Sequence, residues 1–124
     1  MELTAEELWA FLPGGYLLTI AIEIPILWLG LSPSHPRDRR LIAGCWLTAC
    51  TYPIVILVLP WVGGARWGYM AYLAVAETFA PLAECLLFRA AFPIPPRRTA
   101  ALRDLAAIVA ANIASFLVGL WISM

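Results

Sequence analysis

The sequence predicts an all-α integral membrane protein in which four transmembrane helices form one antiparallel bundle. The chain of 124 residues is 63% hydrophobic and only 13% charged, and its mean hydropathy is +0.85. Its apolar residues fall into four runs of about 20 residues, the length that a helix needs to cross a hydrocarbon core of roughly 30 Å. Lipid offers no partner to an unpaired backbone group, so helices are expected. The predicted spans are 13–31, 41–60, 67–88 and 102–122, within a single domain over residues 1–124.

The segment before the first span allows two structures. Thr4 and Glu7 have the spacing of a capping box, which favours a short interfacial helix that ends where Pro13-Gly14-Gly15 turns the chain. The alternative is one longer helix that starts at Thr4 and is kinked at Pro13. Three acidic residues near the N-terminus argue against a secretory signal peptide.

The first two spans each place polar groups near their midpoints. Glu23 lies in the middle of the first span, and Thr51 and Tyr52 lie in the middle of the second. An ionised side chain at the bilayer centre costs about 2.5 to 3.5 kcal/mol on insertion scales, so such residues usually face the protein interior and mark a site. We therefore predict that Glu23 binds an ion or substrate, with Thr51 and Tyr52 as partners.

The third span carries two carboxylates on one face. Glu77 and Glu84 are almost two helical turns apart, or about 10.5 Å along the axis. This spacing suits stepwise proton transfer from the cytoplasmic face to Glu84, then to Glu77 and Glu23. The alternative is that the carboxyl groups are neutral, form hydrogen bonds to Tyr52, Thr51 or Asn112, and serve packing specificity alone.

The fourth span combines a polar residue with a stripe of small ones. Asn112 lies near the midpoint, where it either belongs to the site or forms an interhelical hydrogen bond worth about 0.6 to 2 kcal/mol. Small side chains recur every four residues and allow another helix to approach closely. They are Ala107, Ala111, Ser115 and Gly119. The approaching helix belongs either to this chain or to a second copy, so we expect a homo-oligomer or a larger membrane complex.

Prolines interrupt three of the spans at similar depth. Pro25, Pro53 and Pro81 have no N–H to donate, so each leaves the carbonyl four residues earlier without its usual partner. The freed carbonyls belong to Ala21, Ala49 and Glu77. Carbonyl oxygens beside carboxylates suit a proton or a hard cation. The alternative is that the prolines only kink the helices.

The arginines predict the orientation of the bundle. The chain has no lysine, and seven of its eight arginines lie in or beside the two connections that share a side, with only Arg66 opposite. Positively charged short loops stay cytoplasmic, so both termini are expected outside, on the periplasmic face of a bacterial inner membrane. The connection over residues 90–99 is Pro-rich and carries Arg97 and Arg98. We expect it to anchor to lipid, the alternative being a docking strip for a cytoplasmic partner.

The composition argues against several other classes. His35 is the only histidine, so neither a bis-histidine haem site nor a zinc cluster is expected. The sequence has no phosphate-binding loop and no nucleic-acid-binding module. Cys45 and Cys85 lie at similar depth and would permit a soft-metal pair if their helices touch, although buried cysteines usually act as small hydrophobes. We expect a protein that is not an enzyme and that needs no cofactor.

The size, the four spans and Glu23 resemble the small multidrug resistance transporters, and Tyr16–Glu23, YLLTIAIE, is similar to that family's first helix. The resemblance covers one helix and departs from the family at Ile24-Pro25-Ile26 and in the two carboxylates of the third span, so it carries over Glu23 alone. The sequence as a whole predicts a proton- or cation-coupled transporter or channel component. The alternative is a non-catalytic membrane subunit or assembly factor of a larger complex.

Overall fold

The computed structural model describes residues 5–123, and residues 5, 8, 11, 60–67, 69 and 123 are described by their backbone alone. This part of the chain is helical and contains no strand. Its elements are α1 (Ala5–Gly30), α2 (Arg37–Pro53), the π-helical turn η1 (Ile54–Val58), α3 (Leu59–Ala91) and α4 (Arg98–Ser123). Four stretches are long and apolar enough to cross a membrane: Leu12–Gly30, Arg37–Val58, Met70–Ala91 and Arg98–Ile122. The prediction of an all-helical chain with four such helices is confirmed.

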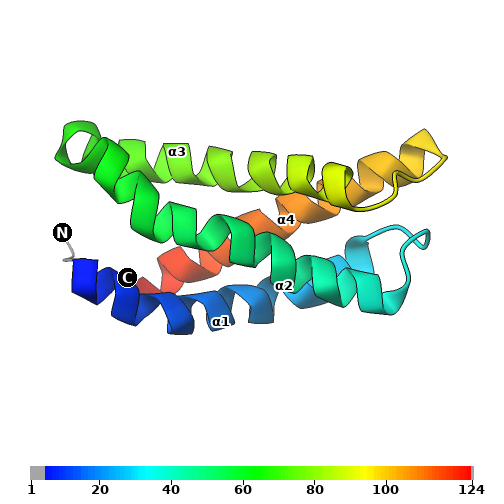
Figure 1. The fold of residues 1–124 in the computed structure, drawn as a ribbon, viewed down its shortest axis with the longest axis horizontal. Helices are drawn as coiled ribbons and strands as arrows, with labels where there is room; N and C mark the ends of the chain where they lie inside the picture. The colour runs from blue at the N-terminus through cyan, green and yellow to red at the C-terminus, as the bar shows by residue number, and fades with distance from the viewer. Residues whose placement is uncertain (1–4, 124) are drawn as a thin grey trace.

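The four helices form a ring in chain order (Figure 1). α1 packs against α2 and α4, and α3 packs against the same two helices, whereas α1 and α3 lie diagonally opposite with no close backbone approach. Successive connections lie at alternate ends, so neighbouring helices are antiparallel. Both ends of the described chain lie at one end of the bundle, and the connections that follow α1 and α3 lie at the other, which we call the arginine end.

α1 is one continuous helix that passes through Pro13. Of the two structures that the sequence allowed, the longer helix is found, and a separate interfacial helix that ends at Pro13 is not formed. Glu6 and Glu7 occupy the first turn of α1, where negative charge complements the helix dipole. Thr4, the first residue of the expected capping box, lies outside the described residues.

Two helices begin earlier than predicted at the arginine end. α2 starts at Arg37 instead of residue 41, and α4 starts at Arg98 instead of residue 102. Hydropathy ends a span at the first charged residue, but arginine is a good helix former and its backbone continues the helix. Pro36, in an extended conformation, fixes the start of α2.

The predicted connection between the second and third spans, at residues 61–66, has a helical backbone, and the membrane-length stretches on either side end at Val58 and begin at Met70. The chain reverses direction within the first turns of α3 (Figure 1). Gly68 has a φ of 72° just before the third membrane-length stretch. Only glycine adopts this left-handed conformation without strain.

The η1 turn places a backbone carbonyl where a side chain can reach it. Leu59 N–H donates to the carbonyl of Ile54, five residues back, so the carbonyl of Val55 would next meet Pro60, which has no N–H. The Tyr72 hydroxyl of α3 donates to that carbonyl at 2.7 Å. This bond ties α3 to η1, and single π-helical turns of this kind often occur at functional sites.

The hydrophobic core lies toward the arginine end. Its buried members come from all four helices and the start of the first connection: Leu27, Leu31, Ala43, Leu47, Phe88, Ala107, Ile108 and Ala111. Large apolar side chains are also exposed on the outer faces, among them Leu29, Met70 and Trp121. Extended exposed apolar surface is unfavourable in water, and it is compatible with a small membrane protein.

Gly44 allows α1 and α2 to approach closely. A Cβ at Gly44 would lie 2.8 Å from Cγ1 of Ile24 and 3.5 Å from its Cα. We expect Gly44→Ala to lower the free energy of unfolding by about 1 to 3 kcal/mol, measured by reversible denaturation in mixed micelles. Gly119→Ala is the matched control, because a Cβ there meets no atom within 4 Å. Equal losses in the two variants would contradict this packing.

Candidate functional site

A cleft of about 300 Å³ lies between the helices and contains all three predicted carboxylates, Glu23, Glu77 and Glu84. Its polar lining is completed by Thr19, Thr48, Thr51, Tyr52, Tyr72, Asn112 and Ser115. The remaining walls are aliphatic side chains, two glycines and Phe116, and no arginine or histidine lines the cleft. The described part of the chain therefore presents three acidic groups to this space and no basic one.

Glu23 is held by hydroxyl groups from two neighbouring helices. Its side chain is buried, with 1% of the residue exposed. Thr48 Oγ1 on α2 donates to Glu23 Oε1 at 3.3 Å, and Ser115 Oγ on α4 donates to Oε2 at 2.7 Å. A buried carboxyl group needs such donors, because an unpaired polar atom in an apolar interior is costly.

Glu84 is held in the same way by the same two helices. It is 2% exposed. Thr51 Oγ1 on α2 donates to Glu84 Oε2 at 2.8 Å, and Asn112 Nδ2 on α4 donates to Oε1 at 3.1 Å. The second hydrogen of Asn112 Nδ2 goes to the carbonyl of Ile108 at 2.9 Å. Asn112 is therefore fully used as a donor.

Glu84 and Glu23 each have a hydroxyl partner with a second acceptor within reach. The Thr51 hydroxyl, which has one hydrogen, lies 2.8 Å from Glu84 Oε2 and 3.1 Å from the carbonyl of Leu47. If Glu84 is ionised, Thr51 donates to it. If Glu84 carries a proton on Oε2, Glu84 donates to Thr51, and the threonine turns to Leu47. Both protonation states are thus satisfied without movement of the backbone.

Ser115 provides the same alternative for Glu23 and connects it to the Glu84 site. The Ser115 hydroxyl lies 2.7 Å from Glu23 Oε2 and 3.0 Å from the carbonyl oxygen of Asn112. Asn112 in turn donates to Glu84 through its side chain. A continuous set of polar contacts therefore runs from Glu84 through Asn112 and Ser115 to Glu23. The path predicted from the sequence went through Glu77 instead.

Glu77 differs from the other two carboxylates. It lies on the same face of α3 as Glu84 and lines the cleft, as its spacing predicted, but it is only half-buried. It makes no hydrogen bond or ion pair to any residue that the structure describes. Glu77 is therefore the carboxylate that can bind a species entering the cleft.

The remaining predicted residues lie in different surroundings. Tyr52 lines the cleft, and its ring centroid lies 6.5 Å from that of Tyr16. Ala111 is buried in the core, whereas Gly119 is exposed and lines the cleft. Ser115, predicted as a packing residue, is a hydrogen-bond donor to Glu23. Of the small residues of α4, Ala111 therefore packs in the core, whereas Ser115 and Gly119 line the cleft.

The predicted cluster of proline-freed carbonyls is not formed at the cleft. Ala21 and Ala49 are exposed and do not line it, and only Glu77 of the three residues does. Thr48, in contrast, was missed by the sequence analysis. Its position three residues before Thr51 puts both hydroxyls on one helix face, and this spacing was the available signal.

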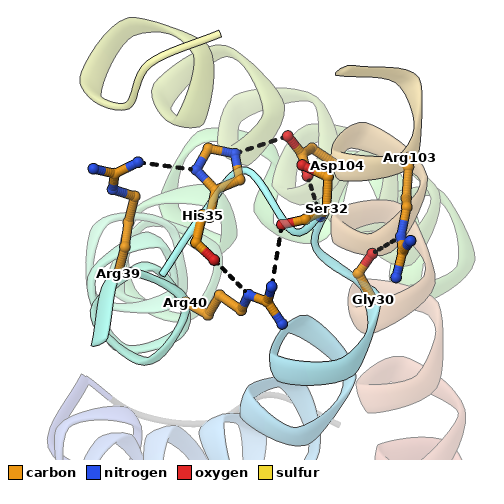
Figure 2. Close-up of polar contacts among 7 residues, drawn as sticks. All are labelled: Gly30, Ser32, His35, Arg39, Arg40, Arg103 and Asp104. Atoms are coloured by element: carbon orange, nitrogen blue, oxygen red, sulfur yellow. Dashed lines mark hydrogen bonds and ion pairs between the residues drawn. The ribbon is translucent and has the colours of Figure 1, made fainter. Parts of the chain in front are cut away.

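A second polar cluster, the Asp104 cluster, closes the arginine end of the bundle (Figure 2). Asp104 on α4 accepts hydrogen bonds from the backbone N–H of Ser32 at 2.7 Å and from His35 Nε2 at 2.8 Å. Asp104 and His35 are 2% and 1% exposed. His35 Nδ1 faces Arg39 Nη1 at 3.4 Å. The sequence analysis did not predict this cluster.

Two arginines cap the C-terminal end of α1. The last carbonyls of a helix have no intrahelical partner, and positive charge is favourable there. Arg40 donates to the carbonyl of Trp28 at 2.7 Å, and Arg103 donates to that of Leu29 at 3.3 Å. Arg103 also donates to the carbonyl of Gly30 at 2.9 Å (Figure 2). These bonds fasten α1 to α2 and α4 just beyond the core.

Cys85 Sγ lies 3.9 Å from the carbonyl of Leu105 on α4, so it is directed toward α4. Among the residues that the structure describes, no group of three or more His, Cys, Asp or Glu side chains is arranged to hold a metal ion.

The fold and the cleft define a class: a small protein of four helices, each long enough to span a membrane, with three carboxylates in an internal cleft. No protein-family model, curated protein or solved structure matches the chain.

Proposed function

We propose that this chain is a small, non-catalytic membrane protein that moves protons or small cations, as a transporter or as a channel component. The observation that carries the proposal is that the three carboxylates differ in their hydrogen-bond partners. Glu23 and Glu84 are each bound to hydroxyl and amide donors, whereas Glu77 faces the cleft without a partner among the described residues. One group is free to bind an entering ion, and two are arranged to accept or release a proton.

The charge of the cleft supports a positively charged ligand. Three carboxylates and no basic side chain line it, and its low-dielectric walls strengthen their attraction for a cation. Two tyrosines and a phenylalanine also line this space, and aromatic faces attract cations. A midplane carboxylate site between helices is a common arrangement in membrane transporters.

The position of the hydrophobic core favours a cleft that is closed at the arginine end. Leu31, Phe88 and the Asp104 cluster lie toward the arginine end, and none of them lines the cleft. At the opposite end, the lining continues to Gly15 and Leu120. We propose that the structure represents a state that admits an ion from the end where the termini lie.

Flux measurements test this proposal directly. Purified protein in liposomes is expected to dissipate an imposed proton gradient, reported by an enclosed pH-sensitive dye, faster than liposomes without protein. If protons are carried only in exchange for a cation, the flux appears when sodium, potassium or a small amine is supplied on the opposite side. Protein-containing and empty liposomes that behave alike under every gradient would contradict the proposal.

The second candidate is a subunit or assembly factor of a larger membrane complex. The observation that favours it is the extent of large apolar side chains exposed on the outer faces of α1 and α4, including Leu17, Ile113 and Leu117. Mild detergent extraction followed by native mass spectrometry distinguishes the two. A second membrane protein in constant ratio would support the subunit, and a chain found alone or only with copies of itself would count against it.

A further inference from the structure

The arginines at the arginine end fall into two groups that the sequence does not distinguish. Arg39, Arg40 and Arg103 are directed toward the protein, where they contact His35 and the carbonyls at the end of α1. The side chains of the others are exposed and have no hydrogen bond or ion pair to a described residue. These four are Arg37, Arg89, Arg97 and Arg98.

Three of the free arginines lie at one corner of the bundle. Arg89 is in the last turn of α3, and Arg97 and Arg98 lie where α4 begins. The same shallow recess is lined by Arg89, by Pro95 and by Ala101 in the first turn of α4. The positive end of the α4 dipole adds to their field. Asp104 also lines this recess, but it is only 2% exposed and accepts hydrogen bonds from Ser32 and His35, so the charges exposed at this corner are those of the arginines.

Exposed apolar side chains lie directly beside these charges. Ile94, in the connection between Arg89 and Arg97, is 59% exposed, and Leu102, one turn into α4, is 52% exposed. A partner that satisfies both features has an anionic head next to hydrocarbon. An anionic phospholipid has both parts. An acidic soluble protein could bind the arginines, but it would not be expected to contact Leu102, which lies on the side of a membrane-length helix.

We propose that Arg89, Arg97 and Arg98 form a binding site for the phosphate headgroup of an anionic phospholipid, whose acyl chains lie against Ile94 and Leu102. Arginine is suited to this because its planar guanidinium group binds phosphate oxygens in pairs. The inference requires that the helices lie in a membrane. It does not depend on the function of the cleft, so either can fail without the other.

Native mass spectrometry of the detergent-purified protein with equal amounts of phosphatidylglycerol and phosphatidylcholine tests the site. The wild-type protein is expected to retain phosphatidylglycerol preferentially. Each of R89Q, R97Q and R98Q should weaken phosphatidylglycerol binding about fivefold, since one arginine near an anionic surface contributes about 1 kcal/mol. Phosphatidylcholine binding should stay unchanged. Circular dichroism checks that the variants are folded, as expected for exposed side chains without protein partners.

Two matched controls make the result specific. R66Q removes one positive charge from the connection that the sequence places at the opposite end, and R37Q removes an exposed one at the start of α2. Both should leave phosphatidylglycerol binding within about twofold of wild type. Equal retention of the two lipids by wild type, an equal loss in R37Q and R97Q, or full displacement of lipid by millimolar inorganic phosphate would each overturn the proposed site. Capture of an acidic protein without lipid preference would do so as well.

Discussion

Glu77→Gln is expected to abolish protein-dependent flux while the protein remains folded. Glu77 is the only one of the three cleft carboxylates without a hydrogen-bond partner among the described residues, so its removal breaks no internal bond. Glutamine has nearly the same shape but neither a negative charge nor a proton to release at ordinary pH. The loss should therefore appear in liposome flux and leave the helical circular dichroism and the unfolding midpoint almost unchanged.

Glu6→Gln is the matched control for this experiment. It makes the same chemical change at an exposed position in the first turn of α1, where the expected effect on flux is small. If Glu77→Gln carries flux at the wild-type rate, the role assigned to Glu77 is wrong. If both variants lose flux equally, the effect is one of overall charge, and the cleft is not its cause.

Asp104→Ala is expected to destabilise the bundle by about 3 kcal/mol, because removing one partner of a buried pair leaves the other unsatisfied. Asp104 accepts hydrogen bonds from the Ser32 backbone and from His35, which join the connection after α1 to α4. Without the carboxylate, both donors are buried with no acceptor. Reversible unfolding in mixed micelles, followed by circular dichroism, measures the loss.

Asp38→Ala provides the comparison for Asp104→Ala. Asp38 is exposed, and among the described residues its carboxylate accepts a hydrogen bond only from the adjacent backbone N–H of Arg39. Its removal should change the free energy of unfolding by no more than about 0.5 kcal/mol. A small effect of Asp104→Ala, similar to that of Asp38→Ala, would show that the buried contacts at the arginine end contribute little to stability.

The polar residues of this chain thus serve two separate tasks. Around the cleft, carboxylates meet hydroxyl groups that have an alternative acceptor, so a proton can be present or absent. At the arginine end, Asp104 meets an N–H and an imidazole, and Arg40 and Arg103 meet carbonyls. These partners offer no such alternative, and they hold helices together. The hydrophobic core around Leu31 and Ile108 separates the two regions.

Hydropathy located the four helices well and their ends less well. A run of apolar residues identifies a span, but it cannot show that the helix continues through Arg37 or through residues 61–66, because backbone hydrogen bonding does not depend on side-chain polarity. Pro13 illustrates the same limit, because a proline within a helix and a proline between two helices give the same hydropathy pattern. The structure has a continuous helix there.

Composition and helical periodicity are local properties, so the sequence alone predicts the helical class, the number of membrane-length helices and the three carboxylates within them. Which of these groups meet depends on the tertiary structure. It pairs Glu84 with Thr51 and Asn112, pairs Glu23 with Thr48 and Ser115, leaves Glu77 in the cleft, and buries His35 against Asp104. The physical reason is that these contacts join residues 25 to 92 positions apart, and their pairing depends on how each helix is rotated about its axis.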